Sequence, residues 1–144
     1  MKSQQRLLDL FSATGSVAAV FRQHGYAVTT VDVDAKMKPD IVANVLNWNY
    51  RGMPQGQFDV VFAASPCTEY SQAMTGRLRN LEKADAIVLR TLEIIQYLKP
   101  KQWFLENPDT GLLKTRGILD HLPSVRVDYC QFSPWGWMKP TRVW

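Results

Sequence analysis

Short apolar runs alternate with polar segments in the first half of the chain. Three runs, residues 6–11, 26–33 and 57–64, are rich in apolar and β-branched residues, which is typical of buried strands. Residues 17–23 have helical spacing, and a shorter strand is expected within residues 40–46. The pattern therefore predicts strand, turn and helix, followed by further strands.

The second half contains the clearest helical pattern. Apolar residues recur three and four positions apart over residues 81–98, until Pro100 ends the pattern. Strands are then predicted over residues 102–105 and 125–132, with a weaker helix over residues 112–122 between them. This alternation predicts an α/β fold, with a mostly parallel sheet and helices on both faces.

Composition adds limits on size and location. The chain has 144 residues, of which 46% are apolar and 21% charged, and it shows no repeat or linker, so we expect one globular domain over residues 1–144. No stretch approaches the ~18 apolar residues of a membrane span. Asp9 interrupts the only apolar run that a signal peptide would use, so we expect a cytoplasmic protein that does not enter the membrane.

Charge and cysteine content are weakly informative. The net charge is +4, and the whole excess lies after residue 70, which gives slight support for contact with a polyanion. Cys67 and Cys130 form neither a disulfide framework nor a zinc cluster, and we expect no metal site. Cys130 lies within a predicted strand and is interpreted as a packing residue.

Polar segments gather where predicted strands end. These segments are residues 9–16, Asp32 with Asp34, residues 65–67 and residues 106–108. In a parallel sheet the ends meet at one edge, where ligands bind. A turn that contains Gly, followed by an acid at the end of the next strand, fits an adenosine-type cofactor. The turn lacks GxGxxG spacing, so by itself it is better interpreted as a structural turn, and its position relative to Asp32 is what favours the cofactor.

The neighbouring residues indicate what roles Cys67 and Glu106 have. Pro66 ends the strand ladder before Cys67, and a polar loop follows, which favours an accessible thiol over a buried packing residue. Neither His24 nor His121 is placed to act as a base, so a Cys-His hydrolase is disfavoured. Glu106 follows an apolar strand, and desolvation there should raise its pKa, although a loop or cap role is the alternative. A nucleophile with a protonated acid suits addition to an electron-poor ring.

Five segments, in this order, resemble the cytosine-5 DNA methyltransferase family, in particular its small phage-type members. They cover nearly all of residues 6–144, and they are LLDLFSATGS, VTTVDVD, FDVVFAASPCTEYS, WFLENP and YCQFSPWGWMKPTRVW. The resemblance implies a Rossmann-like methyltransferase domain that transfers a methyl group to carbon 5 of cytosine in DNA through a covalent cysteine adduct. The alternative is a truncated or degenerate fold that binds cofactor, nucleic acid or a partner chain without turnover.

The resemblance also implies roles for individual residues. It implies S-adenosylmethionine as cofactor, contacted by Asp9, Phe11, Thr14, Gly15, Asp32, Asn44 and Pro66. It implies a catalytic set in which Cys67 adds to carbon 6 of cytosine, Glu106 engages ring nitrogen 3 and Arg142 is the second basic residue of a QxRxR block. A bacterial or phage-infected cell is the expected setting.

Several positions depart from the family pattern. Ala13 stands where the family usually has the first Gly of the turn, and Asn44 stands where it usually has Asp. Pro140 replaces the first Arg of QxRxR, which leaves Lys139 and Arg142 as cations. The chain ends before the target recognition region of the family, so we expect a catalytic domain without it.

Contacts with nucleic acid are expected near the cysteine loop and near the end of the chain. Arg77 and Arg79 follow the loop and suit phosphate contacts, or they are solvated residues at a helix start. Lys139 is a third candidate, and the tryptophans near it are interpreted either as stacking or as packing residues: Trp135, Trp137 and Trp144. DNA is the expected partner, with RNA, a free nucleotide and a homodimer left open. An adenine aminomethyltransferase is disfavoured, because residues 65–68 are not an Asp/Asn-Pro-Pro-aromatic loop.

Overall fold

The computed structural model describes residues 3–132, 134 and 138–144. One seven-stranded sheet has the order β3-β2-β1-β4-β5-β7-β6. The strands are β1 (Arg6–Leu10), β2 (Ala27–Asp32), β3 (Ile41–Val42), β4 (Val60–Ala64), β5 (Gln102–Pro108), β6 (Val125–Asp128) and β7 (Pro140–Val143); the α-helices are α1 (Ser16–Gln23) and α2 (Leu81–Leu98). Single 3-10 turns cover Ala35–Met37, Tyr50–Gly52, Leu113–Thr115 and Tyr129–Gln131.

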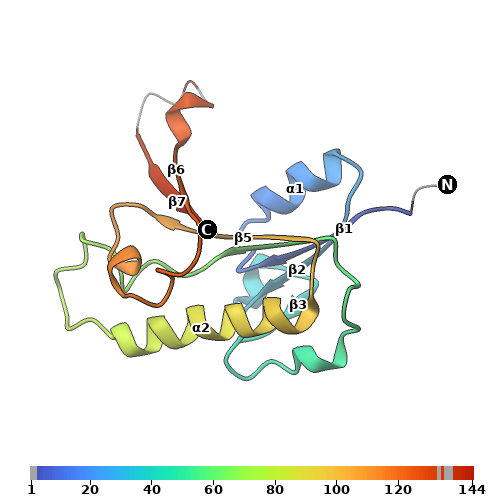
Figure 1. Ribbon diagram of the computed structural model, residues 1–144, viewed down its shortest axis with the longest axis horizontal. Helices are drawn as coiled ribbons and strands as arrows, with labels where there is room; N and C mark the ends of the chain where they lie inside the picture. The colour runs from blue at the N-terminus through green and yellow to red at the C-terminus, as the bar shows by residue number, and fades with distance from the viewer. Residues whose placement is uncertain (1–2, 133, 135–137) are drawn as a thin grey trace.

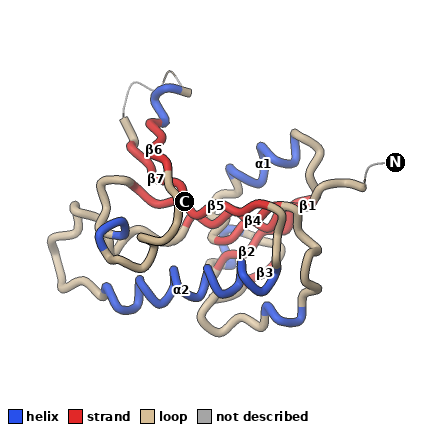
Figure 2. The backbone as a smooth tube through the Cα atoms, in the orientation of Figure 1, coloured by secondary structure: helices blue, strands red, loops and turns tan. Residues whose placement is uncertain are grey.

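The sheet is parallel from β3 to β5 and antiparallel beyond it. All pairs among β1 to β5 are parallel, whereas β7 pairs antiparallel with both β5 and β6. Helices α1 and α2 lie on opposite sides of the sheet (Figure 1), and the loops that follow β3 and β4 are long (Figure 2). The predicted α/β class, with a mostly parallel sheet and helices on both faces, is therefore confirmed.

Helix α2 covers the more apolar face of the sheet. Asn80 caps its start, because the Asn80 Oδ1 accepts from the Lys83 N–H at 3.0 Å. The helix ends at Leu98, and the next residue, Lys99, has a left-handed backbone conformation and precedes Pro100. Each fully buried Leu or Ile contributes roughly 1.5–3 kcal/mol. The main apolar cluster on this face includes Leu8, Leu10, Val31, Val61, Ala63, Ile94, Ile95 and Leu98.

The opposite face of the central strands carries the polar residues that matter for the site. Side chains alternate between faces along a strand, so Asp9 and Glu106 point away from the face that Leu8 and Leu105 share with α2. Helix α1 packs against β1 and β2 on this side. Phe104, further along the same face, is 37% exposed. Glu106 therefore lies on the less covered side of the sheet.

Two predicted elements differ in the structure. The helix expected over residues 112–122 is wrong: only Leu113–Thr115 is helical, as a 3-10 turn, and Gly117 with φ +78° interrupts any longer helix. The strand expected over residues 125–132 ends at Asp128, opposite Pro140 of the unpredicted strand β7. Proline has no N–H to continue a ladder, and the chain turns into a 3-10 turn that contains Cys130. Among the described helices, none is both long and apolar enough to cross a membrane.

Candidate active site

The turn between β1 and α1 has an unusual backbone. Phe11, Ala13 and Gly15 have φ values of 60°, 43° and 76°, a region that residues other than Gly rarely adopt. The Gly15 N–H donates to the Ser12 carbonyl at 2.7 Å, and the Ser12 N–H donates to the Val31 carbonyl at 3.1 Å. The turn is therefore closed on itself and attached to β2.

Asp32, at the end of β2, joins this turn through its carboxylate. Its Oδ2 accepts from the Ala13 N–H at 2.8 Å, and its Oδ1 accepts from the Asp34 N–H at 2.9 Å. Asp32 is half-buried, whereas Ala13 and Thr14 are exposed. The structure thus brings the predicted turn and the predicted acid together at one accessible place.

Asn44 lies close to the same place. The Ala43 N–H donates to the Asp32 carbonyl at 2.9 Å, so the next residue, Asn44, follows directly beside the acid. The Asn44 side chain is exposed, and its Oδ1 accepts from the Leu46 N–H at 3.0 Å. An amide oxygen can accept a second hydrogen bond, so this arrangement leaves it able to contact a ligand.

Asp9 lies beneath the turn. Its side chain is 1% exposed, and its Oδ2 has no hydrogen-bond partner among the described residues. Burial raises the pKa of Asp9 to about 6, and the charge of Asp32 adds to that rise. Asp9 is therefore placed to support the turn from within.

The carboxyl ends of β4 and β5 are linked by side-chain hydrogen bonds. Ala64 pairs with Glu106, and the Asn107 side-chain amide donates to Ser65 at both the carbonyl, 3.0 Å, and the hydroxyl, 3.2 Å. The loop that follows Ser65 contains Cys67, a free, half-buried cysteine whose carbonyl accepts from the Tyr70 N–H at 3.0 Å. Pro66, between them, is exposed.

Glu106 is a buried carboxyl group with one unsatisfied oxygen. It is 8% exposed, and its Oε1 has no hydrogen-bond partner within the described part of the chain. Burial raises the pKa of Glu106, as the sequence predicts, while the Lys139 ammonium and the Thr141 and Tyr129 hydroxyls act in the opposite direction. A carboxyl group in this state can carry the proton that hydrogen-bond donation requires.

Arg142, which the resemblance places in the catalytic set, does not lie beside Glu106 in the structure. In the β5–β7 register Arg142 lies opposite Asn107, and Glu106 therefore faces the other side of the sheet. The Arg142 guanidinium donates to Asp109 Oδ1 at 2.7 Å and to Ser124 Oγ at 2.9 Å. It thus forms an ion pair that supports the sheet.

Sequence patterns do not single out Tyr129 and Thr141, whose hydroxyls act on the pKa of Glu106. The sequence predicts a strand through Tyr129 but none at Thr141, and it is the β5–β7–β6 register that brings the two segments to the carboxyl group. Lys139 was expected to contact nucleic acid, and in the structure its Nζ lies 5.3 Å from the Tyr129 ring centroid. The spacing of Lys139 and Thr141, two positions apart across the start of β7, is a sequence signal for this grouping.

The loop after Cys67 is organised by its own arginines. Arg77 pairs with Glu69, and Arg79 donates to the carbonyls of Glu69, Ser71 and Met74. Arg77 keeps 54% of its side chain exposed, so it is the more accessible of the two cations.

Of the three tryptophans considered for stacking, Trp144 can be described and the others cannot. Trp144 packs against the apolar cluster that contains Leu105 and Leu113, which agrees with the packing interpretation. Trp135 and Trp137 lie outside the described residues.

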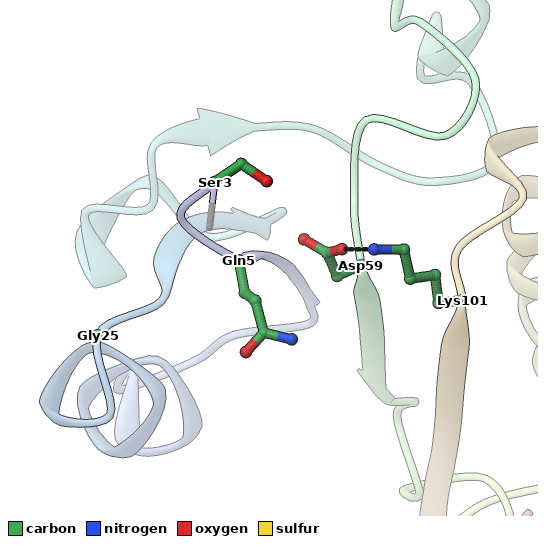
Figure 3. Close-up of a pocket in the computed structure, with 5 residues that line it drawn as sticks. All are labelled: Ser3, Gln5, Gly25, Asp59 and Lys101. Atoms are coloured by element: carbon green, nitrogen blue, oxygen red, sulfur yellow. Dashed lines mark hydrogen bonds and ion pairs between the residues drawn. The ribbon is translucent and has the colours of Figure 1, made fainter. Parts of the chain in front are cut away.

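Other parts of the surface do not add to the site. His24 and His121 are exposed, and the described residues contain no cluster of His, Cys, Asp and Glu suited to a metal ion. A hollow lies at the amino ends of the strands, away from the site at their carboxyl ends (Figure 3). It is lined by Ser3, Gln5, Gly25, Asp59 and Lys101. There Lys101 Nζ lies 2.6 Å from Asp59 Oδ1, so these two residues form an ion pair with each other.

Comparison with known proteins establishes the family. The model of the C-5 cytosine-specific DNA methylase family matches residues 5–119. A probable DNA (cytosine-5)-methyltransferase of Frog virus 3 (isolate Goorha) is 37% identical over 153 residues, which cover 96% of this chain and 69% of that protein. The chain therefore belongs to the C-5 cytosine-specific DNA methylase family.

Solved structures agree at the level of fold. The Entamoeba histolytica methyltransferase EhMeth matches 99% of this chain and 53% of its own, with a TM-score of 0.68 and 14% identity. The S. pombe Dnmt2 methyltransferase matches 97% of this chain and 50% of its own, with a TM-score of 0.63 and 11% identity. The chain thus spans about half the length of these two proteins and shares the fold of methyltransferases.

Proposed function

We propose that the chain transfers a methyl group from S-adenosylmethionine to carbon 5 of cytosine in DNA, with Cys67 as a covalent nucleophile. The observation that carries this proposal is the tie between Asn107 and Ser65, because it holds the start of the Cys67 loop beside the buried Glu106. Family membership supports the same reaction.

The residues at the β1–α1 turn fit the cofactor. Asp32 offers a half-buried carboxylate that can accept hydrogen bonds from ribose hydroxyls, and the exposed backbone at Ala13 and Thr14 lies beside it. Asn44 and Pro66 border the same edge. When bound, the cofactor supplies a methyl group on a positively charged sulfur.

Cys67 and Glu106 then act on the cytosine ring. The Cys67 thiolate forms a bond to carbon 6, and the electron pair of the carbon 5–carbon 6 double bond moves into the ring. Protonated Glu106 donates its proton to ring nitrogen 3, which neutralises that charge and leaves carbon 5 as an enamine nucleophile. After carbon 5 has taken the methyl group, loss of its proton to solvent breaks the bond to Cys67, and nitrogen 3 returns its proton to Glu106.

A base inside a duplex cannot reach these side chains. The target cytosine has to leave the stack, at a cost of a few kcal/mol in unstacking and unpairing. Contacts to the flanking phosphates offset part of that cost, and Arg77 is an accessible cation on the Cys67 loop. Arg77 would then exchange its partner Glu69 for a phosphate.

A duplex oligonucleotide containing 5-fluorocytosine tests the proposal. Fluorine at carbon 5 blocks the final elimination, so incubation with S-adenosylmethionine should leave a protein–DNA adduct that survives denaturing electrophoresis. Cys67→Ser should abolish the adduct, whereas Cys130→Ser, at the other free cysteine, should retain it. Absence of an adduct from the wild-type chain would contradict the proposal, and an RNA oligonucleotide run in parallel separates the two nucleic acids.

One observation favours the second candidate, a fold that binds without turnover. Ala13 adopts φ 43° at the position where the resemblance expects Gly, and its methyl group occupies the accessible turn. Calorimetric titration with S-adenosylmethionine distinguishes the two candidates when read with the adduct assay. Binding without an adduct would support the non-catalytic fold.

A further inference from the structure

Glu106 shares its face of the sheet with residues from the β6–β7 hairpin. In the antiparallel β5–β7 register, Glu106 lies opposite Val143 and Pro108 lies opposite Thr141. Partners in an antiparallel pair point to the same side. The Thr141 side chain therefore lies on the Glu106 face, and Lys139 lies two positions before it, directly before the start of β7.

The neighbouring strand brings an aromatic ring to the same place. Asp128 is paired with Pro140, so that Tyr129 and Lys139 come next along the two chains. The Lys139 ammonium lies over the Tyr129 ring, 5.3 Å from its centroid, which is within the range of a cation–π contact. Tyr129 therefore follows β6 at the end of the hairpin where Lys139 precedes β7, and the Lys139 ammonium lies over its ring.

The two hydroxyls near Glu106 are not equally available. Thr141 Oγ1 donates its proton to the Lys139 carbonyl at 3.2 Å, whereas Tyr129 makes no such bond with the backbone in the described residues. Glu106 Oε1 is buried without a partner. Burying a carboxyl group without a hydrogen-bond donor costs free energy and leaves its orientation undetermined. Tyr129 is therefore the group best placed to orient it.

We propose that Tyr129 and Lys139 are positioning residues for Glu106: the Tyr129 hydroxyl orients the carboxyl group, and Lys139, held over the ring, supplies the nearby positive charge. Arg142 cannot supply that charge, because it lies on the opposite face and is paired with Asp109. This inference rests on the proposed function, since it gives Glu106 a reacting partner to be oriented towards. Lys139 and both hydroxyls lower the pKa of Glu106 against the effect of burial, in agreement with this arrangement.

The free protein provides a test that does not depend on turnover. In protein carrying 13C-labelled glutamate side chains, the Glu106 resonance is assigned by its loss in Glu106→Gln, and its pKa is measured by titration. Lys139→Gln should raise that pKa, and Lys139→Arg should restore it to the wild-type value. Arg126→Gln is the matched control, because Arg126 lies on the same hairpin, is paired with Asp128 and points to the other face, and it should leave the pKa unchanged.

An equal effect of Lys139→Gln and Arg126→Gln on the Glu106 pKa would overturn the role of Lys139. Tyr129→Phe keeps the ring and removes only the hydroxyl, so it should raise the Glu106 pKa without changing the fold. No change in this variant would overturn the role of Tyr129.

Kinetics then separate positioning from a structural role. Tyr129→Phe should lower kcat about tenfold and leave KM within about twofold, because the defect lies in the orientation of a reacting group. In Lys139→Gln the alkaline limb of the pH profile should move to higher pH with the Glu106 pKa. If the pKa changes are found but no 5-fluorocytosine adduct forms, the positioning stands and the proposed function fails. If the adduct forms and the pKa values do not move, the positioning inference alone is wrong.

Discussion

Asn107 donates its side-chain amide to both the carbonyl and the hydroxyl of Ser65, at 3.0 and 3.2 Å, and is fully buried while doing so. These two residues lie one position beyond the paired ends of β4 and β5, where Ala64 meets Glu106. The two bonds therefore fix the start of the Cys67 loop relative to the carboxyl group, although Cys67 and Glu106 lie 39 positions apart in the sequence.

We expect Asn107→Ala to lower both stability and activity. The substitution leaves the buried Ser65 carbonyl without its donor, which should lower the free energy of unfolding by about 1–3 kcal/mol in urea titrations. It should also lower kcat more than it raises KM, because the loop loses its anchor. Asn49→Ala is the control, since Asn49 is exposed and its side chain caps nothing, and it should leave both unchanged. Equal effects of the two substitutions would contradict the anchoring role.

Ala13→Gly should stabilise the protein. Ala13 has φ 43°, and an L-residue in the left-handed region costs ~1–2 kcal/mol, part of which is offset by the greater entropy of Gly in the unfolded chain. The net gain in the free energy of unfolding should be about 0.5–1 kcal/mol. Ala19→Gly, on the exposed side of α1, should have the opposite sign and cost about 0.5–1 kcal/mol. A loss of stability in Ala13→Gly would show that the turn relaxes without strain.

Asp32→Asn should weaken S-adenosylmethionine binding at least tenfold in calorimetry. The change removes the negative charge that strengthens hydrogen bonds from ribose hydroxyls, and bonds to charged groups are worth about 1.5–3 kcal/mol. It also replaces one of the two oxygens that hold the Ala13 and Asp34 N–H groups. Asp34→Asn serves as the control, because Asp34 only caps the following 3-10 turn through Lys36. Similar affinities for both variants would place the ribose elsewhere.

The salt dependence of DNA binding should identify the phosphate contact. Arg77→Gln should reduce the slope of log K against log salt concentration by about 1, as expected when one phosphate contact is lost. An unchanged slope would mean that Arg77 stays paired with Glu69 when DNA binds.

Arg79→Gln should act on the loop instead. Arg79 donates to three backbone carbonyls, so its loss should loosen residues 69–80 and accelerate cleavage by thermolysin near the exposed Leu78. If the rate of cleavage matches that of the wild type, the guanidinium does not organise the loop.

The parallel half of the fold could be predicted from the sequence because each strand there is a short apolar run with its own turn. Helix α2 was predicted over its full length, since its apolar spacing and Pro100 are local signals. Burial of Glu106 was predicted for a similar reason: the preceding residues of β5 are apolar. Local pattern therefore sufficed where one segment determines its own structure.

The antiparallel hairpin could not be predicted in this way. Strand β7 begins at Pro140 and has only four residues, and its identity depends on pairing with β5 and β6 rather than on its own composition. The same register decides which side chains meet Glu106, so the sequence alone singles out neither Tyr129 nor Thr141 as its neighbours. A shift of one residue reverses the face of every side chain, and the sequence alone does not set that register.

The buried Asp9 predicts a pH dependence of stability with a definite sign. Its pKa rises from 3.8 to about 6 in the folded protein, chiefly through burial. Between these values the folded protein retains a proton that the unfolded chain has lost, so the free energy of unfolding should fall as pH rises through this window. The full effect is ~3 kcal/mol and is reached above pH 6. Asp9→Asn, which cannot ionise, should therefore gain stability relative to the wild type as pH increases from 4 to 7, measured by urea unfolding without cofactor. Asp120→Asn, at an exposed carboxyl group, should follow the wild-type curve. If the Asp9→Asn and wild-type curves run parallel across this range, Asp9 does not carry a proton in the folded protein, and the turn above it is held over a charged carboxylate.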